Sequence, residues 1–94
     1  MAKRYAVVTT NKRGVFFGEI VTSNLETKLV TLKDAQMCVY WSAETRGVLG
    51  LASKGPQKGS KVTPIIPQIE LNDVTAVMTA TAEAEKQWRT GIWD

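Results

Sequence analysis

Two neighbouring aromatic residues, Tyr40 and Trp41, are the side chains of this sequence best suited to holding a ligand. Two cations follow them, Arg46 in a glycine-containing turn and Lys54 at the start of a loop, and Ser42 adds a hydroxyl donor. An aromatic ring can stack on a planar ligand, while guanidinium and ammonium groups form charge-assisted hydrogen bonds with phosphate. The sequence therefore predicts that these five residues hold an anionic, planar small molecule that resembles a nucleotide.

A structural role for the same residues is the alternative. Neighbours on a strand point to opposite faces, so only one of Tyr40 and Trp41 can face a one-sided core. Trp41 would then cover the core, and Arg46 would be a solvated surface residue.

The sequence contains few residues suited to catalysis or metal binding. The 94 residues include no histidine and one cysteine, Cys38. The commonest general base and the commonest metal ligand are therefore missing, and the scattered carboxylates do not form a ligand set. We expect no metal, no cofactor and no catalysis, with an enzyme that uses Lys, Glu or Tyr as a minor alternative. Cys38 lies in an apolar stretch and is expected to be a buried structural thiol.

The C-terminal segment carries two more tryptophans. Ala84 and Trp88 are four residues apart and share one face of a predicted helix. That face packs either on the sheet or on another subunit. A small core leaves little room for Trp93, and tryptophan is enriched at interfaces. We therefore predict a homo-oligomer whose interface contains Trp88, Ile92 and Trp93.

Charge is spread unevenly along the chain. Residues 1–61 hold ten Lys and Arg against four Asp and Glu, and residues 62–94 hold two against five. Opposite halves can dock on each other or on a partner copy, or can steer an anionic ligand. Because the basic residues come mostly in ones and twos, nucleic-acid binding is not favoured. No stretch approaches the ~20 apolar residues of a membrane span. A single cysteine and the absence of a signal-peptide pattern suit the cytoplasm.

The order of elements follows from β-branched runs and turn residues. Strands are expected at 4–10, 15–23, 28–33 and 36–41. After a break, an edge strand or irregular extended segment with two prolines is expected, followed by a last strand at 74–79. Residues 42–52 are expected to form a helix of one or two turns or an ordered loop, and 53–61 a mobile loop. A helix should begin at the capping residue Thr81 and stop at Gly91.

This pattern predicts a mainly β (α+β) fold. Five or six short strands make a small antiparallel curled sheet or barrel, with the C-terminal helix against one side. We expect a single domain over residues 1–94, with the β portion at 3–80 and the helix and tail at 81–94.

The segment from Gly14 to Gly18 is expected to be a hairpin exit, with a bulge or a close backbone approach at Gly18. Phe16 and Phe17 must face opposite sides of their strand. One belongs to the core, and the other lies on an outer face, under a helix or in an interface.

Several motifs resemble an uncharacterised family of small proteins from tailed phages and prophages. In chain order they are Gly14-Val15-Phe16-Phe17-Gly18, Leu32-Lys33-Asp34-Ala35, Tyr40-Trp41, and Leu49 with Leu51-Ala52 before Gly55. The likeness spans residues 5–80, and Gln36 stands where such proteins often carry arginine. It implies a phage-encoded protein acting in the host cytoplasm, and it implies no particular activity.

Two functions follow from the residues and this resemblance together. The first is a non-enzymatic phage accessory protein that binds and sequesters a phosphorylated, nucleotide-like immune signal of the host, which is a form of counter-defence. The second is a protein–protein interaction module that inhibits, or assembles with, a host or phage protein. A nucleotide-binding protein should be stabilised by its ligand, whereas an interaction module should not respond to nucleotides.

Overall fold

The computed structural model describes residues 4–10, 14–24 and 26–90. In chain order its elements are β1 (Tyr5–Thr10), β2 (Val15–Asn24), β3 (Leu29–Tyr40), η1 (Ala43–Thr45), α1 (Gly47–Ser53), β4 (Lys61–Val62), β5 (Ile66–Leu71), β6 (Val74–Thr79) and α2 (Ala82–Thr90). The mainly β fold with a C-terminal helix is therefore confirmed.

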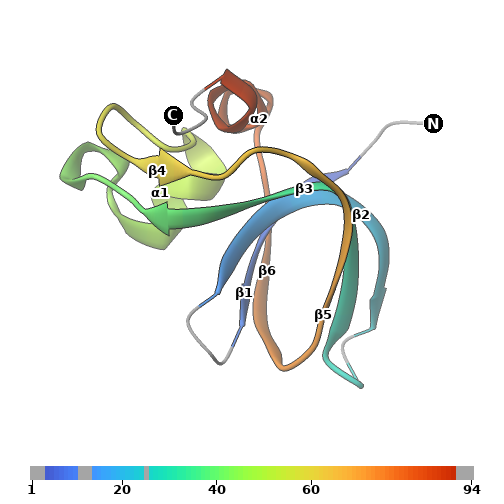
Figure 1. Cartoon of the computed structure of the whole chain (residues 1–94). Helices are drawn as coiled ribbons and strands as arrows, with labels where there is room; N and C mark the ends of the chain where they lie inside the picture. The colour runs from blue at the N-terminus through green and yellow to red at the C-terminus, as the bar shows by residue number, and fades with distance from the viewer. Residues whose placement is uncertain (1–3, 11–13, 25, 91–94) are drawn as a thin grey trace.

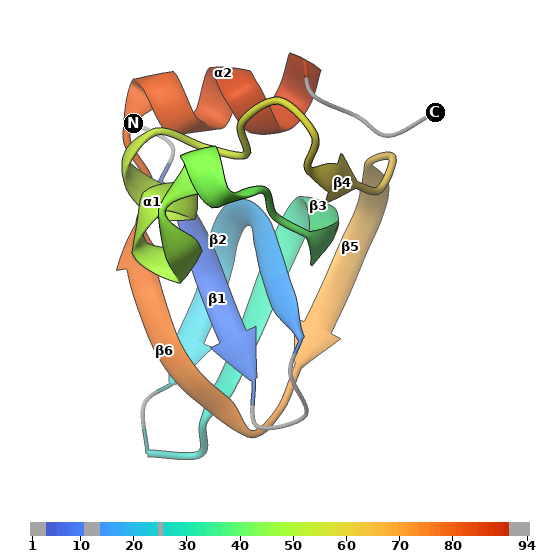
Figure 2. The ribbon, with the colours of Figure 1, turned by 90° about the vertical axis from the view of Figure 1, so that its left-hand side faces the viewer.

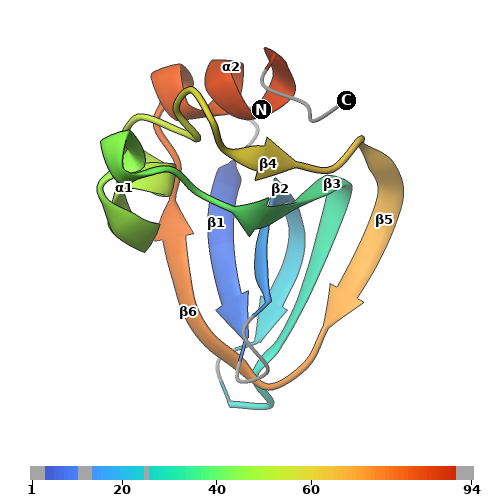
Figure 3. The same ribbon diagram turned by 60° about the vertical axis from the view of Figure 1, so that its left-hand side comes forward.

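The strands of the described residues form one antiparallel sheet in the order β4-β3-β2-β1-β6, and β5 also pairs with β3. The sheet is strongly curved, and β5 and β6 diverge from the turn that joins them (Figure 3). Of the two predicted alternatives, the structure is thus the open curled sheet and not the closed barrel. Helix α2 lies across one end of the strands, with α1 beside it (Figures 1 and 2).

Strand β3 is a single strand of twelve residues, although the sequence predicted two strands that end and begin around Asp34. Asp34 has a φ of 51° in the left-handed region, which Asp tolerates better than most residues. The backbone therefore changes direction without ending the strand. This length lets residues 30–35 pair with β5 and residues 38–40 pair with β4.

Gly18 produces the predicted irregularity in β2. The register with β3 shifts between Phe17 and Glu19, as it does at a bulge. A Cβ atom at Gly18 would lie 3.0 Å from both Leu32 Cβ and the Lys33 carbonyl oxygen. Both parts of the expectation, the bulge and the close backbone approach, are confirmed.

Each face of the sheet buries its own core. The helix-side core contains Val7, Val15, Phe17, Cys38, Leu51, Ala52, Val62, Ala84 and Trp88. The inner core contains Ala6, Val8, Val30, Leu32, Ala35, Leu71 and Val74, with Phe16, Ile20, Ile69 and Val77 half-buried against it. Alternation along β2 sends Phe17 to the first core and Phe16 to the second. Because both faces are covered, neither ring needs to be fully exposed.

Trp88 belongs to the helix-side core, so its assignment to a subunit interface is wrong. Its side chain is fully buried and stacks on Phe17 with 5.0 Å between ring centroids. The indole Nε1 donates a hydrogen bond of 3.0 Å to the Leu51 carbonyl oxygen. Helix α1 and the sheet enclose the ring, and this core is large enough for it. Ile92 and Trp93 lie outside the described residues.

The segments around the helices are close to the prediction. Thr81 Oγ1 accepts a hydrogen bond of 3.0 Å from the Ala84 N–H, which confirms it as the cap of α2. It also donates a 2.7 Å bond to the Ser53 carbonyl oxygen at the end of α1. The expected short helix after Ser42 is present as η1 and α1. The following loop buries Gly55 and Pro56, which its composition did not predict. Gly91, the expected stop of α2, lies outside the described residues.

Candidate functional site

The predicted ligand residues lie around the end of β3 and the two ends of α1. Tyr40 is the last residue of β3, and its side chain is 54% exposed. Trp41 is half-buried and packs against the helix-side core. Trp41 is therefore the member of the pair that faces the core, as the structural alternative supposed, and Tyr40 is the one available at the surface.

Ser42 is occupied inside the protein. Its side chain is buried, and its hydroxyl lies 3.4 Å from each of the hydroxyls of Thr45 and Ser60. The Thr45 hydroxyl also accepts a 3.0 Å hydrogen bond from the Gln57 N–H. This hydroxyl cluster ties η1 to the loop before β4, so Ser42 is a structural residue and not a free donor.

The two predicted cations stand at opposite ends of α1. Arg46 caps its N-terminus with a φ of 66°, and Lys54 caps its C-terminus. Eight residues of helical rise separate them by roughly 12 Å along the axis. The five predicted residues are thus near one another in sequence, but the structure does not gather their polar groups around one pocket. None of them lines the pockets described below.

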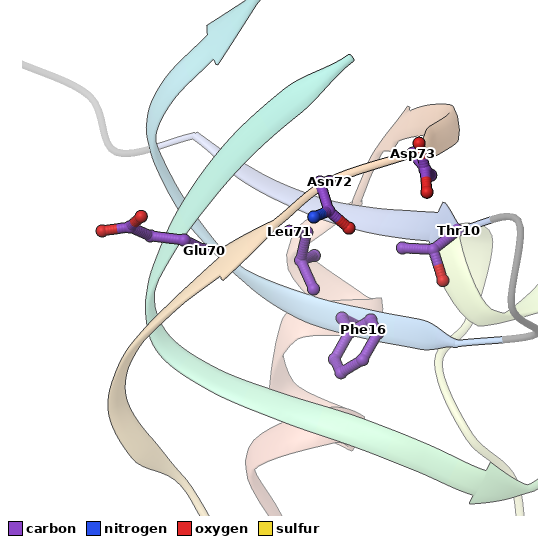
Figure 4. Close-up of a pocket in the computed structure, with 6 residues that line it drawn as sticks. All are labelled: Thr10, Phe16, Glu70, Leu71, Asn72 and Asp73. Atoms are coloured by element: carbon purple, nitrogen blue, oxygen red, sulfur yellow. The ribbon is translucent and has the colours of Figure 1, made fainter. Parts of the chain in front are cut away.

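On the inner side of the sheet, two pockets share the residue Phe16. Figure 4 shows the residues that line the first of them. The first has a volume of about 130 Å³ and is lined by Thr10, Phe16, Glu70, Leu71, Asn72 and Asp73. The second has a volume of about 50 Å³ and is lined by Phe16, Ala35, Gln36, Met37, Thr63, Ile66 and Ile69. We call the two together the Phe16 groove.

The strands β2, β3 and β5 place the walls of the Phe16 groove. Phe16 is opposite Met37 in the ladder of β2 and β3, so their side chains share one face. Ile66 is opposite Ala35 in the ladder of β3 and β5. Both pairings direct apolar side chains toward the inner side of the curled sheet, where they line the second pocket.

Gly14 makes room for the Phe16 ring. A Cβ atom at this position would clash with Phe16 Cε2 and would lie 2.8 Å from Thr10 Oγ1. The Thr10 hydroxyl also accepts a 3.1 Å hydrogen bond from the Gly14 N–H. Gly14 was expected at a hairpin exit, and one of Phe16 and Phe17 on an outer face, under a helix or in an interface, but no ligand site was predicted at these residues. The signal in the sequence was that Phe16 and Phe17 are neighbours on one strand, since only one of the two rings can then face the helix-side core.

The rim of the first pocket is acidic. Asn72 lies above Leu71 and Asp73 lies further along the turn on the side of Thr10, whereas the Glu70 side chain points away from the Phe16 ring (Figure 4). Glu70 and Asp73 are the charged residues that line the Phe16 groove, but the Glu70 carboxylate points away from it (Figure 4), and no described Lys or Arg lines either pocket. The lining therefore suits an apolar group accompanied by a positive charge.

Cys38 is a buried structural thiol, as predicted. Burial raises its pKa from 9.0 to about 11, against a smaller opposing effect of a backbone hydrogen bond at Tyr40. A protonated thiol is a poor nucleophile. Within the described ranges, no group of three or more His, Cys, Asp or Glu side chains is placed to hold a metal ion.

One comparison with known proteins gives a result. A family model described as a domain of unknown function, DUF6948, matches residues 3–88. No curated protein and no solved structure matches the chain. Among the described residues, no helix is long and apolar enough to cross a membrane.

Proposed function

The chain belongs to the DUF6948 family, whose description assigns no function, and from the geometry we propose that it is a non-enzymatic module that binds another protein. The binding site is the Phe16 groove. The observation that carries this proposal is that one half-buried aromatic ring forms a wall of two adjoining pockets on the open side of the sheet.

The size and lining of the groove suit a protein side chain. An apolar cavity of about 150 Å³ is large enough to hold benzene, and the first pocket has a volume of about 130 Å³. Ile66, on the wall of the second pocket, is 44% exposed. A partner that covers this surface would gain roughly 25 cal/mol for each Å² of apolar area removed from water.

The charges indicate the kind of partner. The Asp73 carboxylate attracts a basic side chain, while a cation above the Phe16 ring gains a further favourable interaction. We therefore expect the bound segment to place a bulky apolar residue next to a Lys or Arg. The resemblance of the sequence to phage proteins makes a host or phage protein the expected source of this segment.

A phosphorylated ligand fits the same geometry less well. The groove has the Asp73 carboxylate in its lining, which repels phosphate, and no described Lys or Arg. The cations that were expected to bind phosphate, Arg46 and Lys54, lie at opposite ends of α1. Sequestration of a nucleotide-like signal therefore becomes the alternative that the experiment must exclude.

Two neighbouring isoleucines provide a matched test. Ile65 and Ile66 have nearly equal exposed fractions of 43% and 44%, but only Ile66 lines the groove. The wild type, Ile66→Ser and Ile65→Ser are each immobilised, and the amount of each protein that they capture from an extract of the source cells is compared. We expect one partner to be retained by the wild type and by Ile65→Ser, and to be reduced at least tenfold by Ile66→Ser.

The unfolding temperature is measured alongside, with and without a panel of mono-, di- and cyclic nucleotides. The proposal expects no change with any of them. A partner captured equally by both variants contradicts the groove as its site. A nucleotide that raises the unfolding temperature in a concentration-dependent way favours the sequestration alternative instead.

A further inference from the structure

Among the described residues β6 pairs with no strand other than β1. The Val74 N–H at its start donates a 3.2 Å bond to the Lys28 carbonyl oxygen, and the rest of its outer edge pairs with no strand. The strand forms one margin of the sheet (Figure 3). The Ala80 N–H donates a 2.9 Å hydrogen bond to the Tyr5 carbonyl oxygen. In an antiparallel ladder every second residue directs its backbone groups at the neighbouring strand, so Met78 and Ala76 face Val7 and Thr9 of β1 in the same way. The N–H and C=O groups of the residues between them, Val77 and Thr79, therefore point away from the sheet.

This edge lacks the features that usually prevent strand pairing. In natural proteins, charged side chains, proline or very short length prevent an edge strand from pairing with a strand of another chain. The opposite margin has them: β5 contains Pro67 and Glu70, and β4 has two residues. Strand β6 has six residues, Val-Thr-Ala-Val-Met-Thr, with no charge and no proline. Thr75, Ala76 and Thr79 are exposed along it.

The charges at the two ends of β6 are complementary to each other. Arg4 donates a 3.3 Å hydrogen bond to Thr79 Oγ1, so an exposed guanidinium marks the end of the strand. Asp73, also exposed, immediately precedes its first residue. When two identical strands pair antiparallel about a two-fold axis, the end of each lies beside the beginning of the other. Arg4 of one copy then faces Asp73 of the partner subunit, and this contact occurs twice.

From these observations we propose that the protein forms a homodimer by antiparallel pairing of β6 with β6 of a second copy. The outward N–H and C=O groups of Val77 and Thr79 supply the backbone hydrogen bonds. The two Arg4–Asp73 contacts select the antiparallel orientation. The dimer contact shares Asp73 with the lining of the first pocket of the Phe16 groove, while Val77, Thr79 and Arg4 line neither pocket of the groove. This interface replaces the one predicted at Trp88.

Two alanines offer a matched test by sedimentation of the purified full-length protein. Ala76 lies on the exposed edge of β6, and Ala43 is an exposed residue of η1. We expect the wild type and Ala43→Lys to be dimers at tens of micromolar. Ala76→Lys places a charge in the paired edge and should weaken dimerisation at least tenfold. Circular dichroism checks that both variants are folded.

A charge exchange tests the orientation. Arg4→Asp should weaken the dimer, and the double variant Arg4→Asp with Asp73→Arg should restore it. Hydrogen exchange should show that the Val77 and Thr79 amides are protected in the wild-type dimer and unprotected in Ala76→Lys. A monomeric wild type, a dimer unaffected by Ala76→Lys, or protection at another surface would overturn the proposal.

Discussion

At the scale of single residues, Gln36 links three segments through a buried amide. Its side chain is 2% exposed, and Nε2 donates hydrogen bonds to the carbonyl oxygens of Trp88 and Thr63 at 2.8 and 3.2 Å. Its Oε1 accepts a 2.6 Å bond from Arg89 Nη1. The Arg89 guanidinium also lies over the Phe17 ring, 4.9 Å from its centroid. This polar contact fixes α2 on the sheet.

We expect Gln36→Ala to lower the free energy of unfolding by about 2–3 kcal/mol, because it leaves buried polar groups without partners. Gln68→Ala, on the exposed side of β5, should change it by less than about 0.5 kcal/mol. Urea unfolding followed by fluorescence measures both values. Equal effects of the two substitutions would show that the buried network contributes nothing.

Cys38 gives the protein a specific pH dependence. In the unfolded chain the thiol loses its proton around its ordinary pKa of 9.0, whereas in the folded protein it keeps the proton up to about 11. Between pH 9 and about pH 11 the unfolded state therefore binds fewer protons than the folded state. The contribution of Cys38 to stability is complete below pH 9 and is lost as the pH rises toward 11.

The measurement is the difference in unfolding free energy between wild type and Cys38→Ala as a function of pH. This difference removes the effects of lysines and tyrosines that titrate in the same range. We expect it to fall steadily above pH 9 and to be constant between pH 6 and 8. A difference that is constant up to pH 11 would contradict the raised pKa of the folded state.

At the scale of elements, Gly55 determines how the loop after α1 meets α2. It has a φ of +84°, and a Cβ atom there would lie 2.5 Å from Gln87 Cβ and 2.8 Å from the Ala84 carbonyl oxygen. Gly47 has a similar φ of +80°, but a Cβ atom there would meet nothing within 4 Å. The two glycines share the backbone requirement and differ in packing.

Alanine at each position separates these effects. We expect both substitutions to destabilise the protein because of the positive φ. Gly55→Ala should cost about 1–3 kcal/mol more than Gly47→Ala, since it also forces α2 away from the loop. Thermal unfolding compares the two variants. If they are equally stable, α2 can shift without cost and the close packing described here is not required.

The sequence predicted most elements because their signals are local. β-branched runs and glycine turns located the strands, and Thr81 marked the start of α2 by hydrogen-bonding chemistry that involves only its neighbours. The continuity of β3 was missed because it depends on a left-handed Asp34 that the two adjacent ladders hold in place. The burial of Gly55 and Pro56 was missed for a similar reason, since α2 is distant in sequence.

The candidate site could not be predicted in the same way. The residues of the Phe16 groove come from β1, β2, β3, the segment between β4 and β5, β5 itself and the turn before β6. Their meeting depends on the curvature of the sheet, which no local pattern encodes. The five residues that were predicted to bind a ligand are close in sequence, but α1 separates Arg46 from Lys54. Adjacency in sequence was therefore a poor guide to a shared pocket.

At the scale of the whole molecule, the protein has two cores and one incompletely covered face. The helices pack on the helix-side core, while the inner side stays accessible beside the Phe16 ring. A partner segment in this space would complete the burial that the open sheet leaves unfinished. The central claim is therefore that binding occurs at the Phe16 groove.

Hydrogen exchange of the full-length protein, with and without its captured partner, tests this claim most directly. We predict that the partner slows exchange in residues 15–17 of β2 and 66–71 of β5, and leaves residues 40–54 unchanged. Ile66→Ser should abolish this protection, and Ile65→Ser should preserve it. Protection confined to residues 40–54, with the Phe16 groove exchanging as in the free protein, would contradict the account.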